Sequence, residues 1–300
     1  MRRALVLLNP NAGRGRAEGL FARAAEGVAG KVDLRTVLCT DPDEAFERAV
    51  AGLAEGTVDR LIAVGGDGSG NLAATALMES GKAGEVAFGL VPAGTGSDFV
   101  RHLDPGTRPV DRLERLLSTE TTRPCDLIEV NLASGGRRYS LNVASAGLSS
   151  AVAERINRDS RRAGGSYLLL TVGALLTYRP YRCRVEIDGR ELFDNPLFLV
   201  AIANGPFFGK AMKVAPEARI DDGLLDVIVV PPMARWKMPW RLPQFLKGRH
   251  LKYPEVIFQR AREVRLEPDR ELPSLDLDGD SIPAETVSCR VLQGALKLLC

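Results

Sequence analysis

The first 120 residues alternate between short apolar runs and segments whose apolar residues recur at helical spacing. Four runs have the length of buried strands, namely residues 4–8, 32–38, 61–66 and 86–94. We expect helices between and after them, starting near Ala17, Pro42, Asn71 and Ser97. Strand–helix repeats of this length predict a parallel sheet with helices on both faces, which is the strongest constraint on the fold.

The pattern changes near residue 124, where short runs rich in valine, isoleucine and leucine follow one another between turn residues. This spacing is typical of antiparallel sheets. We therefore expect an α/β domain over residues 1–123 and a mainly antiparallel β domain over residues 124–287, with the segment 288–300 returning to the first domain. Helical inserts are expected over residues 150–178 and 234–248, and a strand followed by a short helix at the C-terminus.

Composition argues against several classes of protein. The net charge of +2 gives no reason to expect a nucleic-acid partner. The five cysteines include no CxxC pair, which favours free thiols in a reducing compartment. The apolar stretch at residues 167–178 is well short of the roughly 20 residues that a membrane span needs. We therefore expect a cytoplasmic protein.

Glycine-rich loops follow three of the four predicted strands. They read NPNAG at residues 9–13, GGDGSGN at 65–71 and PAGTGSD at 92–98. In a parallel sheet such loops lie at one edge, where their backbone N–H groups can face a phosphate. A tight turn would explain any one loop, but three at successive strand ends favour a single anion-binding site.

Asp67 lies inside the second loop. A carboxylate beside a phosphate repels it unless a cation or a transferable proton is present. The chain has no Walker motif. Gly68, Gly70 and Ala73 match a dinucleotide-binding fingerprint, but the acidic residue that such a site needs at the end of the next strand is missing. The residues therefore favour phosphoryl transfer, in which Asp67 faces Mg²⁺ or accepts a proton.

Six motifs follow one another along nearly the whole chain. They are NPNAG, GGDGSGN, LVPAGTGSDFVR, SLNVASAGLSS (140–150), APEARIDDGLLDVIVV (215–230) and LDLDGDSI (275–282). In this order they resemble the diacylglycerol kinase catalytic-domain superfamily, which includes sphingosine kinases and bacterial lipid kinases. The resemblance implies an NAD kinase/diacylglycerol kinase-like α/β domain followed by a β-sandwich domain. NAD kinases share the GGDG motif, so that motif alone does not separate the two groups.

The resemblance also implies which residues bind ATP. Nucleotide contacts fall on Asn9, Thr40 and Thr95 and on the loop residues Gly66, Asp67, Gly68, Ser69, Gly70 and Asn71. Asn9, Thr40 and Thr95 each follow a predicted strand, so each could supply a hydrogen bond at the same edge of the sheet. A plain helix N-cap is an equally good interpretation of Thr40.

The metal site and the proton acceptor are implied by the same resemblance. Mg²⁺ would be held by Asp222 with the carbonyl groups of Arg219 and Leu224, since oxygen ligands suit this ion. A simple chain reversal is the alternative for this turn. The proton acceptor corresponds to Asp280, where the family has a glutamate one methylene longer, and Asp67 is the rival base. Leu72 also replaces a glutamate of the family, which removes a charge. The changes at Leu72 and Asp280 leave open a protein that binds a nucleotide or a lipid without catalysis.

Residues 231–253 combine six basic with four aromatic residues, and no acid occurs between Asp226 and Glu255. Both tryptophans of the chain, Trp236 and Trp240, lie here. Such a composition marks helices at an anionic membrane surface. The alternatives are a solvated helix with its tryptophans in the core, and a nucleic-acid surface.

We interpret the chain as an ATP- and Mg²⁺-dependent lipid kinase, a phosphotransferase with an alcohol group as acceptor. The acceptor would be diacylglycerol or a related lipid, met at a membrane surface. The lipid and metal sites would belong to the second domain. The interpretation places the protein at the inner face of the membrane as a peripheral protein, without a nucleic-acid partner, and is compatible with a homodimer. Two alternatives stay open, an NAD kinase-like enzyme and a catalytically weak protein that binds a nucleotide or a lipid.

Overall fold

The computed structural model describes residues 2–93, 97–159, 173–174, 177–209, 211–234, 238–269, 272–284 and 286–300. The chain forms two compact units. The first consists of Met1–Leu127 with Gln293–Cys300, and the second of Ile128–Leu292. Two strands, β5 (Thr122–Leu132) and β16 (Val287–Leu299), contribute residues to both units.

The first unit contains the predicted parallel sheet, in the strand order β2-β1-β3-β4. The strands are β1 (Arg2–Leu8), β2 (Val32–Leu38), β3 (Arg60–Gly65) and β4 (Ala87–Pro92). The helices are α1 (Arg16–Gly27), α2 (Pro42–Ala54), α3 (Asp67–Glu79), α4 (Asp98–Arg101) and α5 (Pro109–Ser118).

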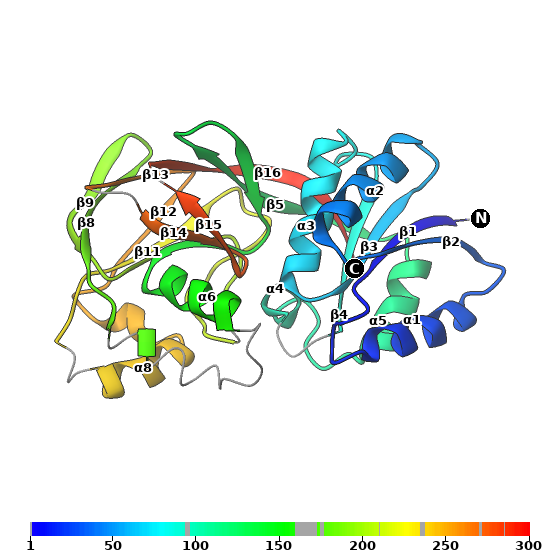
Figure 1. Ribbon diagram of the computed structural model, residues 1–300, viewed down its shortest axis with the longest axis horizontal. Coiled ribbons are helices and arrows are strands. Elements are labelled where there is room, and N and C mark those ends of the chain that lie inside the picture. Colours follow the sequence, from blue (N-terminus) through cyan, green and yellow to red (C-terminus); the bar gives the residue numbers. More distant parts are fainter. Residues whose placement is uncertain are drawn as a thin grey trace. The chain divides into compact units, whose positions relative to one another are not determined.

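Helices cover both faces of this sheet. Figure 1 shows α1 and α5 on one face and α2 and α3 on the other. Ala4–Leu8 are buried without interruption, as expected for a strand with no solvent-facing side. Ala4, Val6 and Leu8 share a core with α1, whose Ala17 and Ala24 are also buried. The α/β architecture predicted from the sequence is therefore confirmed.

The second unit is mainly antiparallel and contains two sheets. One has the order β12-β11-β10-β7-β14-β15, and the other contains β16-β13-β8-β9 with β5 and β6. The remaining bounds are β6 (Arg137–Ser140), β7 (Val143–Gly147), β8 (Tyr181–Ile187), β9 (Arg190–Leu197), β10 (Leu199–Ala203), β11 (Leu225–Val230), β12 (Ile257–Ala261), β13 (Glu263–Pro268), β14 (Leu272–Leu277) and β15 (Asp280–Ala284).

One hydrophobic core joins the two sheets of this unit. It takes alternate residues from most of the strands, for example Val200 and Ile202 from β10, and Val264 and Leu266 from β13. Side chains two apart share a face of a strand, so this alternation is what a sandwich requires. The β-sandwich expectation agrees with this arrangement.

The helical inserts are described only in part. Helix α6 (Leu148–Asp159) lies in the first insert, and residues 160–172 and 175–176 fall outside the described residues, with most of the apolar stretch 167–178. Helix α8 (Met238–Leu246) and the short helix η3 (His250–Lys252) lie in and after the second. Within the described ranges, no helix is both long and apolar enough to cross a membrane.

The short helix predicted at the C-terminus is wrong. Residues 287–299 form one continuous strand, β16, which pairs with β13 and then runs parallel to β4. Leu296, Leu298 and Leu299 are buried in this strand. The edge of β4 offers unpaired backbone groups, and pairing with it decided the conformation of a segment whose sequence alone was ambiguous.

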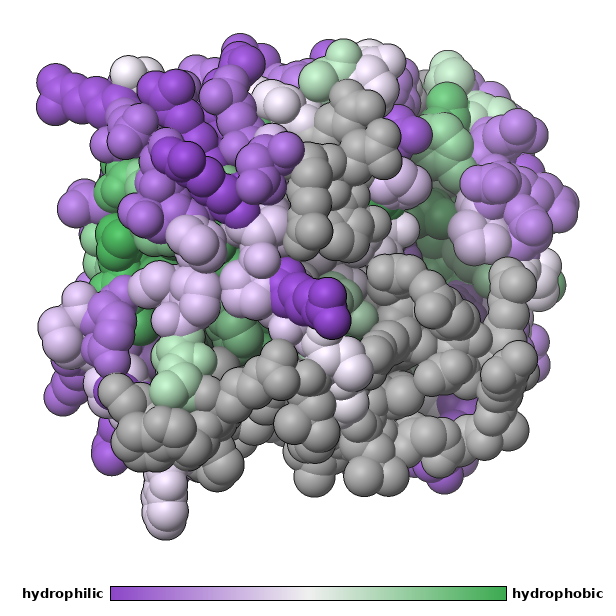
Figure 2. Space-filling model, turned by 60° about the vertical axis from the view of Figure 1, so that its left-hand side comes forward, coloured by the Kyte–Doolittle hydropathy of each residue, from purple (hydrophilic) through white to green (hydrophobic). Residues whose placement is uncertain are grey.

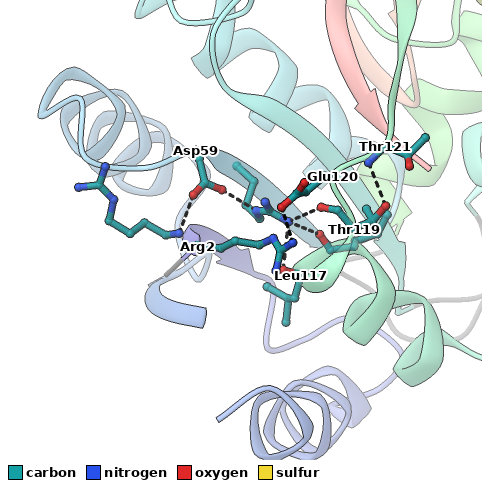
Figure 3. Close-up of polar contacts among 9 residues, drawn as sticks. Arg2, Asp59, Leu117, Thr119, Glu120 and Thr121 are labelled. Atoms are coloured by element: carbon teal, nitrogen blue, oxygen red, sulfur yellow. Dashed lines mark hydrogen bonds and ion pairs between the residues drawn. The ribbon is translucent and has the colours of Figure 1, made fainter. Parts of the chain in front are cut away.

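A buried arginine ties β3 to the end of α5. Arg60 is 5% exposed, and its guanidinium donates to the carbonyl oxygens of Leu116, Leu117 and Thr119 at 2.9–3.0 Å. Its Nε lies 2.6 Å from a carboxylate oxygen of Asp59. Figure 3 shows this network around Asp59, Leu117 and Thr119. The bonds occupy carbonyl groups that a helix end leaves without partners, and they stabilise the sheet edge where β3 begins.

Candidate functional site

The three glycine loops lie at the carboxyl ends of β1, β3 and β4, which are neighbours in the sheet. The Asn9 N–H donates to the Val64 carbonyl at 3.0 Å, and the Ala93 N–H donates to the Gly65 carbonyl at 2.9 Å. Gly13 has φ +63°, and a Cβ there would lie 2.0 Å from the carbonyl oxygen of Ala93. Only glycine fits this contact, so the first and third loops meet.

Helix α3 begins earlier than predicted. The sequence placed its start at Asn71, but the helix begins at Asp67 with Gly66 as its N-cap. Gly65 is required just before it, since a Cβ there would lie 2.2 Å from Ser69 Oγ. The segment 66–71 is thus the amino end of a helix rather than a loop. The first N–H groups of a helix have no partner within it and form a ready site for an anion.

Asp67 connects this helix start to the next one. Its Oδ2 accepts a hydrogen bond from the Asp98 N–H at 2.8 Å, and its Oδ1 accepts one from the Phe99 N–H at 3.1 Å. Both donors belong to the first turn of α4. Each oxygen therefore acts as an acceptor, which is the hydrogen bonding of an ionised carboxylate. The carboxylate fixes the end of the third loop relative to the second.

The other predicted nucleotide contacts have different surroundings. The Asn9 Oδ1 accepts from the Asn11 N–H at 3.0 Å, so this side chain shapes its own loop. Thr40 is exposed after β2. The N-cap interpretation of Thr40 is wrong, because Asp41 caps α2 through a bond from the Glu44 N–H at 2.9 Å. Thr95 lies outside the described residues.

The turn before Asp280 is held by a neighbouring aspartate that the sequence analysis did not single out. Asp278 has φ +55°, and its carboxylate accepts three successive backbone N–H groups, from Leu141 (2.6 Å), Asn142 (3.0 Å) and Val143 (2.8 Å). These donors lead into β7, and Asp280 begins β15. Asp278 therefore anchors the turn that presents Asp280.

A third aspartate of the same run is buried. Asp276 accepts from the Gly279 N–H at 2.9 Å and from Ser145 Oγ at 3.3 Å. Burial, and then repulsion from Asp278, raise its pKa to about 7. Asp280 reaches solvent, and partial desolvation by the surrounding protein raises its pKa too. Aspartates at every second position, 276, 278 and 280, were the signal that could have revealed this cluster from the sequence.

The raised pKa of Asp276 predicts a pH-dependent stability. The folded chain keeps this proton up to about pH 7, whereas an ordinary aspartate at pKa 3.8 in the unfolded chain releases it near pH 4. Between these values the folded state binds more protons, so stability falls as pH rises. We expect the free energy of unfolding to fall on the order of 2 kcal/mol from pH 5 to pH 8 through this group.

Denaturant titrations at both pH values measure this slope. Asp276→Asn imitates the protonated acid and should remove that part of the slope, with its gain in stability largest at pH 8. Asp278, whose pKa burial raises to about 6, acts in the same direction and should leave a smaller slope in the variant. An unchanged slope in Asp276→Asn would contradict the assignment.

The predicted metal ligands lie at the turn before β11. The Asp222 Oδ1 accepts from the Leu224 N–H at 3.1 Å, while Arg219 is exposed. Nearby, Asp226 is 3% exposed and pairs with Arg260 at 3.0 Å. The pKa of Asp226 is raised above its ordinary value. Burial is the main cause, the ion pair with Arg260 opposes it, and the charge of Asp222 adds a further rise.

These oxygen groups suit a divalent cation. The second oxygen of Asp226, Oδ2, is buried without a hydrogen-bond partner among the described residues. In the part of the chain that the structure describes, no group of three or more acidic, histidine or cysteine side chains is placed so that it could hold a metal ion. A metal here would therefore depend on carboxylate, backbone carbonyl and water oxygens together, which is how Mg²⁺ and Ca²⁺ are commonly bound.

Comparison with known families and proteins matches both parts of the chain. Residues 3–130 match the model of the diacylglycerol kinase catalytic domain, and residues 142–300 match that of the YegS C-terminal NAD kinase beta sandwich-like domain. A probable lipid kinase YegS-like protein of Chromohalobacter salexigens is 30% identical over 246 residues, which cover 81% of this chain and 76% of that protein. A diacylglycerol kinase of Mycobacterium tuberculosis is 29% identical over 291 residues, covering 93% and 90%.

Solved structures show the same fold. A putative diacylglycerol kinase from Bacillus anthracis superposes with a TM-score of 0.78 at 22% identity, covering 99% of this chain and 96% of that one. An NAD kinase from Archaeoglobus fulgidus, solved in complex with ATP, superposes with a TM-score of 0.55 at 12% identity, covering 100% and 94%. At these identities the likeness concerns the fold alone.

Proposed function

Because this chain belongs to the diacylglycerol kinase catalytic-domain family and carries its YegS-type C-terminal domain, we propose that it transfers the γ-phosphate of ATP to a hydroxyl group of diacylglycerol or a related lipid. The observation that carries the proposal is the carboxylate of Asp67, which joins the starts of α3 and α4 at the glycine loops. The N-terminus of a helix attracts phosphate, and the negative charge of Asp67 beside it would repel phosphate unless a cation is bound between them.

The α/β domain, residues 1–123 with the returning C-terminal segment, is proposed to bind the nucleotide. The start of α3, Gly66 to Asn71, is proposed to face the phosphates. Within this helix the hydrogen bonds begin at the Gly70 N–H, which donates to the Gly66 carbonyl at 3.1 Å, so the N–H groups proposed to meet the phosphates are those up to Ser69. Asn9, Thr40 and Thr95 are proposed to add polar side chains after the other strands. Phosphoryl transfer needs chiefly positioning and charge neutralisation, which backbone N–H groups and a bound Mg²⁺ supply. Asp67 would then act as the fixed anionic partner of that cation.

Asp280 is proposed as the group that accepts the proton of the lipid hydroxyl. It is exposed, and its carboxylate has no hydrogen-bond partner among the residues described, whereas both oxygens of Asp67 already accept backbone N–H groups. A base must reach the proton that it takes and must be free to receive it. The raised pKa of Asp280 also makes it a stronger base than an ordinary aspartate.

A second, structural Mg²⁺ is proposed to bind Asp222 with the carbonyl groups of Arg219 and Leu224. Asp222→Asn keeps an oxygen that can accept the Leu224 N–H, so the variant removes the charge and preserves the turn. We expect saturating Mg²⁺ to raise the free energy of unfolding of the parent protein on the order of 2 kcal/mol. The variant should gain little and should need more Mg²⁺ for activity.

Thermal unfolding with and without Mg²⁺ measures this difference. Asp221→Asn is the matched control, because it removes the neighbouring charge, which pairs with Arg219 at 3.4 Å, and leaves Asp222 in place. Equal responses to Mg²⁺ in the parent protein and in Asp222→Asn would argue against a metal at this turn.

A panel of acceptors tests the reaction itself. Labelled ATP is offered with diacylglycerol, a sphingoid base or NAD, and label in a lipid product is the expected result. Label in NAD would favour the NAD kinase-like alternative, which here has only the distant fold likeness behind it. ATP binding without transfer to any acceptor would identify a binding protein. The lipid substrate is proposed to lie at the inner membrane surface, and the chain is proposed to form a homodimer, which sedimentation tests.

A further inference from the structure

Helix α8 carries an exposed tryptophan. Among the described residues only two large hydrophobic side chains are exposed, Trp240 at 77% and Leu38 at 47%. On the face drawn in Figure 2, hydrophobic residues outside the grey segments form separate patches between hydrophilic ones. The alternative interpretation, a solvated helix with its tryptophans in the core, is therefore wrong for Trp240. A tryptophan left in water costs free energy that contact with a partner recovers.

The opposite side of α8 is anchored to the second unit. The Phe245 ring stacks on His250 with centroids 4.2 Å apart and planes 11° apart, and buried His250 Nε2 lies 2.9 Å from the Val214 carbonyl oxygen. Arg241 lies over the Tyr253 ring at 3.3 Å. Trp240 precedes Phe245 by five residues, which is a rotation of about 140° around the helix. Trp240 therefore points away from the side that packs.

The end of α8 places a basic residue, Lys247, on the side of Trp240. The Gly248 N–H donates to the Phe245 carbonyl at 3.2 Å and the Arg249 N–H donates to the Gln244 carbonyl at 2.8 Å, with Gly248 at φ +66°. This is a Schellman termination, so helical geometry extends to Lys247. Lys247 follows Trp240 by seven residues, nearly two full turns of a regular helix, so we infer that it lies on the same side of α8, which has Pro243 between them.

Three cations in and after this helix end have no acidic partner among the described residues. Lys247, Arg249 and Lys252 are exposed, and none forms an ion pair with a described residue. The helix end is also firmly seated, because a Cβ on Gly248 would lie 2.9 Å from Pro216 and 3.1 Å from Lys213. An exposed aromatic ring beside unpaired cations on a seated helix is complementary to a surface that is apolar inside and negatively charged outside.

We propose that the α8 face, defined by Trp240, Pro243, Lys247, Arg249 and Lys252, is the surface by which this protein docks on anionic lipid bilayers. Trp240 enters the interface, and the three cations contact lipid head groups. The proposal rests on the proposed function in one respect, since a lipid acceptor requires the enzyme to meet a bilayer. A nucleic-acid surface would use the cations but would not need Trp240 on the same face.

Vesicle sedimentation without nucleotide tests the docking surface. We expect the full chain to bind phosphatidylcholine vesicles that contain phosphatidylglycerol more tightly than vesicles of phosphatidylcholine alone. Trp240→Ala should weaken that binding at least about tenfold. Lys247→Gln and Arg249→Gln should each weaken it about fivefold, the factor expected from ~1 kcal/mol per basic residue near such a surface. Brominated acyl chains should quench tryptophan fluorescence, and this quenching should persist in Trp236→Phe.

Matched controls keep the test specific. Leu38→Ala removes the other exposed hydrophobic side chain among the described residues. Arg190→Gln removes an exposed cation on β9 that has no acidic partner among them, so both variants should bind vesicles as the parent does. The proposal would be overturned if Trp240→Ala bound anionic vesicles as the parent does. It would also be overturned if the protein bound a DNA duplex as tightly as anionic vesicles and Trp240→Ala kept that affinity for DNA.

A soluble substrate separates docking from catalysis. Trp240→Ala should phosphorylate a short-chain diacylglycerol dissolved in buffer at the parental rate while losing activity on vesicles. Loss on both substrates would assign Trp240 to the fold or the reaction and would overturn the docking role. If the parent protein phosphorylates no lipid, the proposed function fails, and the vesicle-binding result then decides the docking surface by itself.

Discussion

Asp67→Asn should lower phosphoryl transfer at least about 10²-fold while costing only about 1–2 kcal/mol of stability. Asparagine replaces one of the two carboxylate oxygens with an NH₂ group, so a side chain held in the same position would turn that NH₂ group toward the Asp98 or the Phe99 N–H. The start of α4 would then shift. The substitution also removes the negative charge proposed to face Mg²⁺. Steady-state kinetics and denaturant unfolding of the same preparation measure the two effects.

Asp41→Asn is the control for this prediction. Asp41 also accepts a backbone N–H at the start of a helix of the first unit, and asparagine caps helices as well as aspartate does. Its activity and stability should stay close to those of the parent. Near-normal turnover in Asp67→Asn would refute the role of this carboxylate, and an unfolded variant would show that its role is structural instead.

Asp278→Ala should cost about 3 kcal/mol or more of the free energy of unfolding. The substitution leaves the N–H groups of Leu141, Asn142 and Val143 without their acceptor, and it places alanine at φ +55°. Asp278→Asn should cost less, because asparagine tolerates this conformation and keeps one acceptor oxygen. Turnover should fall in both variants, since the same turn presents Asp280.

Asp188 offers a matched comparison for Asp278. It also has a positive φ, +47°, and its carboxylate accepts the N–H groups of Arg262 and Glu263 at 3.0 and 2.9 Å. It is exposed, so water can replace its carboxylate, and Asp188→Ala should cost less and leave turnover unchanged. Equal costs at the two positions would show that the partly buried bonds of Asp278 contribute no more to the second unit than the exposed ones of Asp188.

The sequence predicted the helix starts best where the local residues decide them. The predicted start of α2 at Pro42 is confirmed, although the residue that caps the helix is Asp41 and not Thr40. The sequence predicted the start of α3 less well, because the four glycines of residues 65–70 are typical of a loop. There the deciding interactions are tertiary, namely Ser69 packed against Gly65 and the Asp67 carboxylate bound to α4. Local propensity is a weak prior that such contacts override.

The sequence by itself determined the α/β architecture of the first unit and the antiparallel architecture of the second, because the period of apolar residues follows from which faces each strand and helix must bury. It also determined the family, through six motifs in order. Only the tertiary structure decided that Asp278 anchors the turn of Asp280, that Asp276 is buried beside it, and that Trp240 faces water. Asp278 finds its backbone donors 135 to 137 residues away, and contacts at that separation leave no periodic trace in the chain.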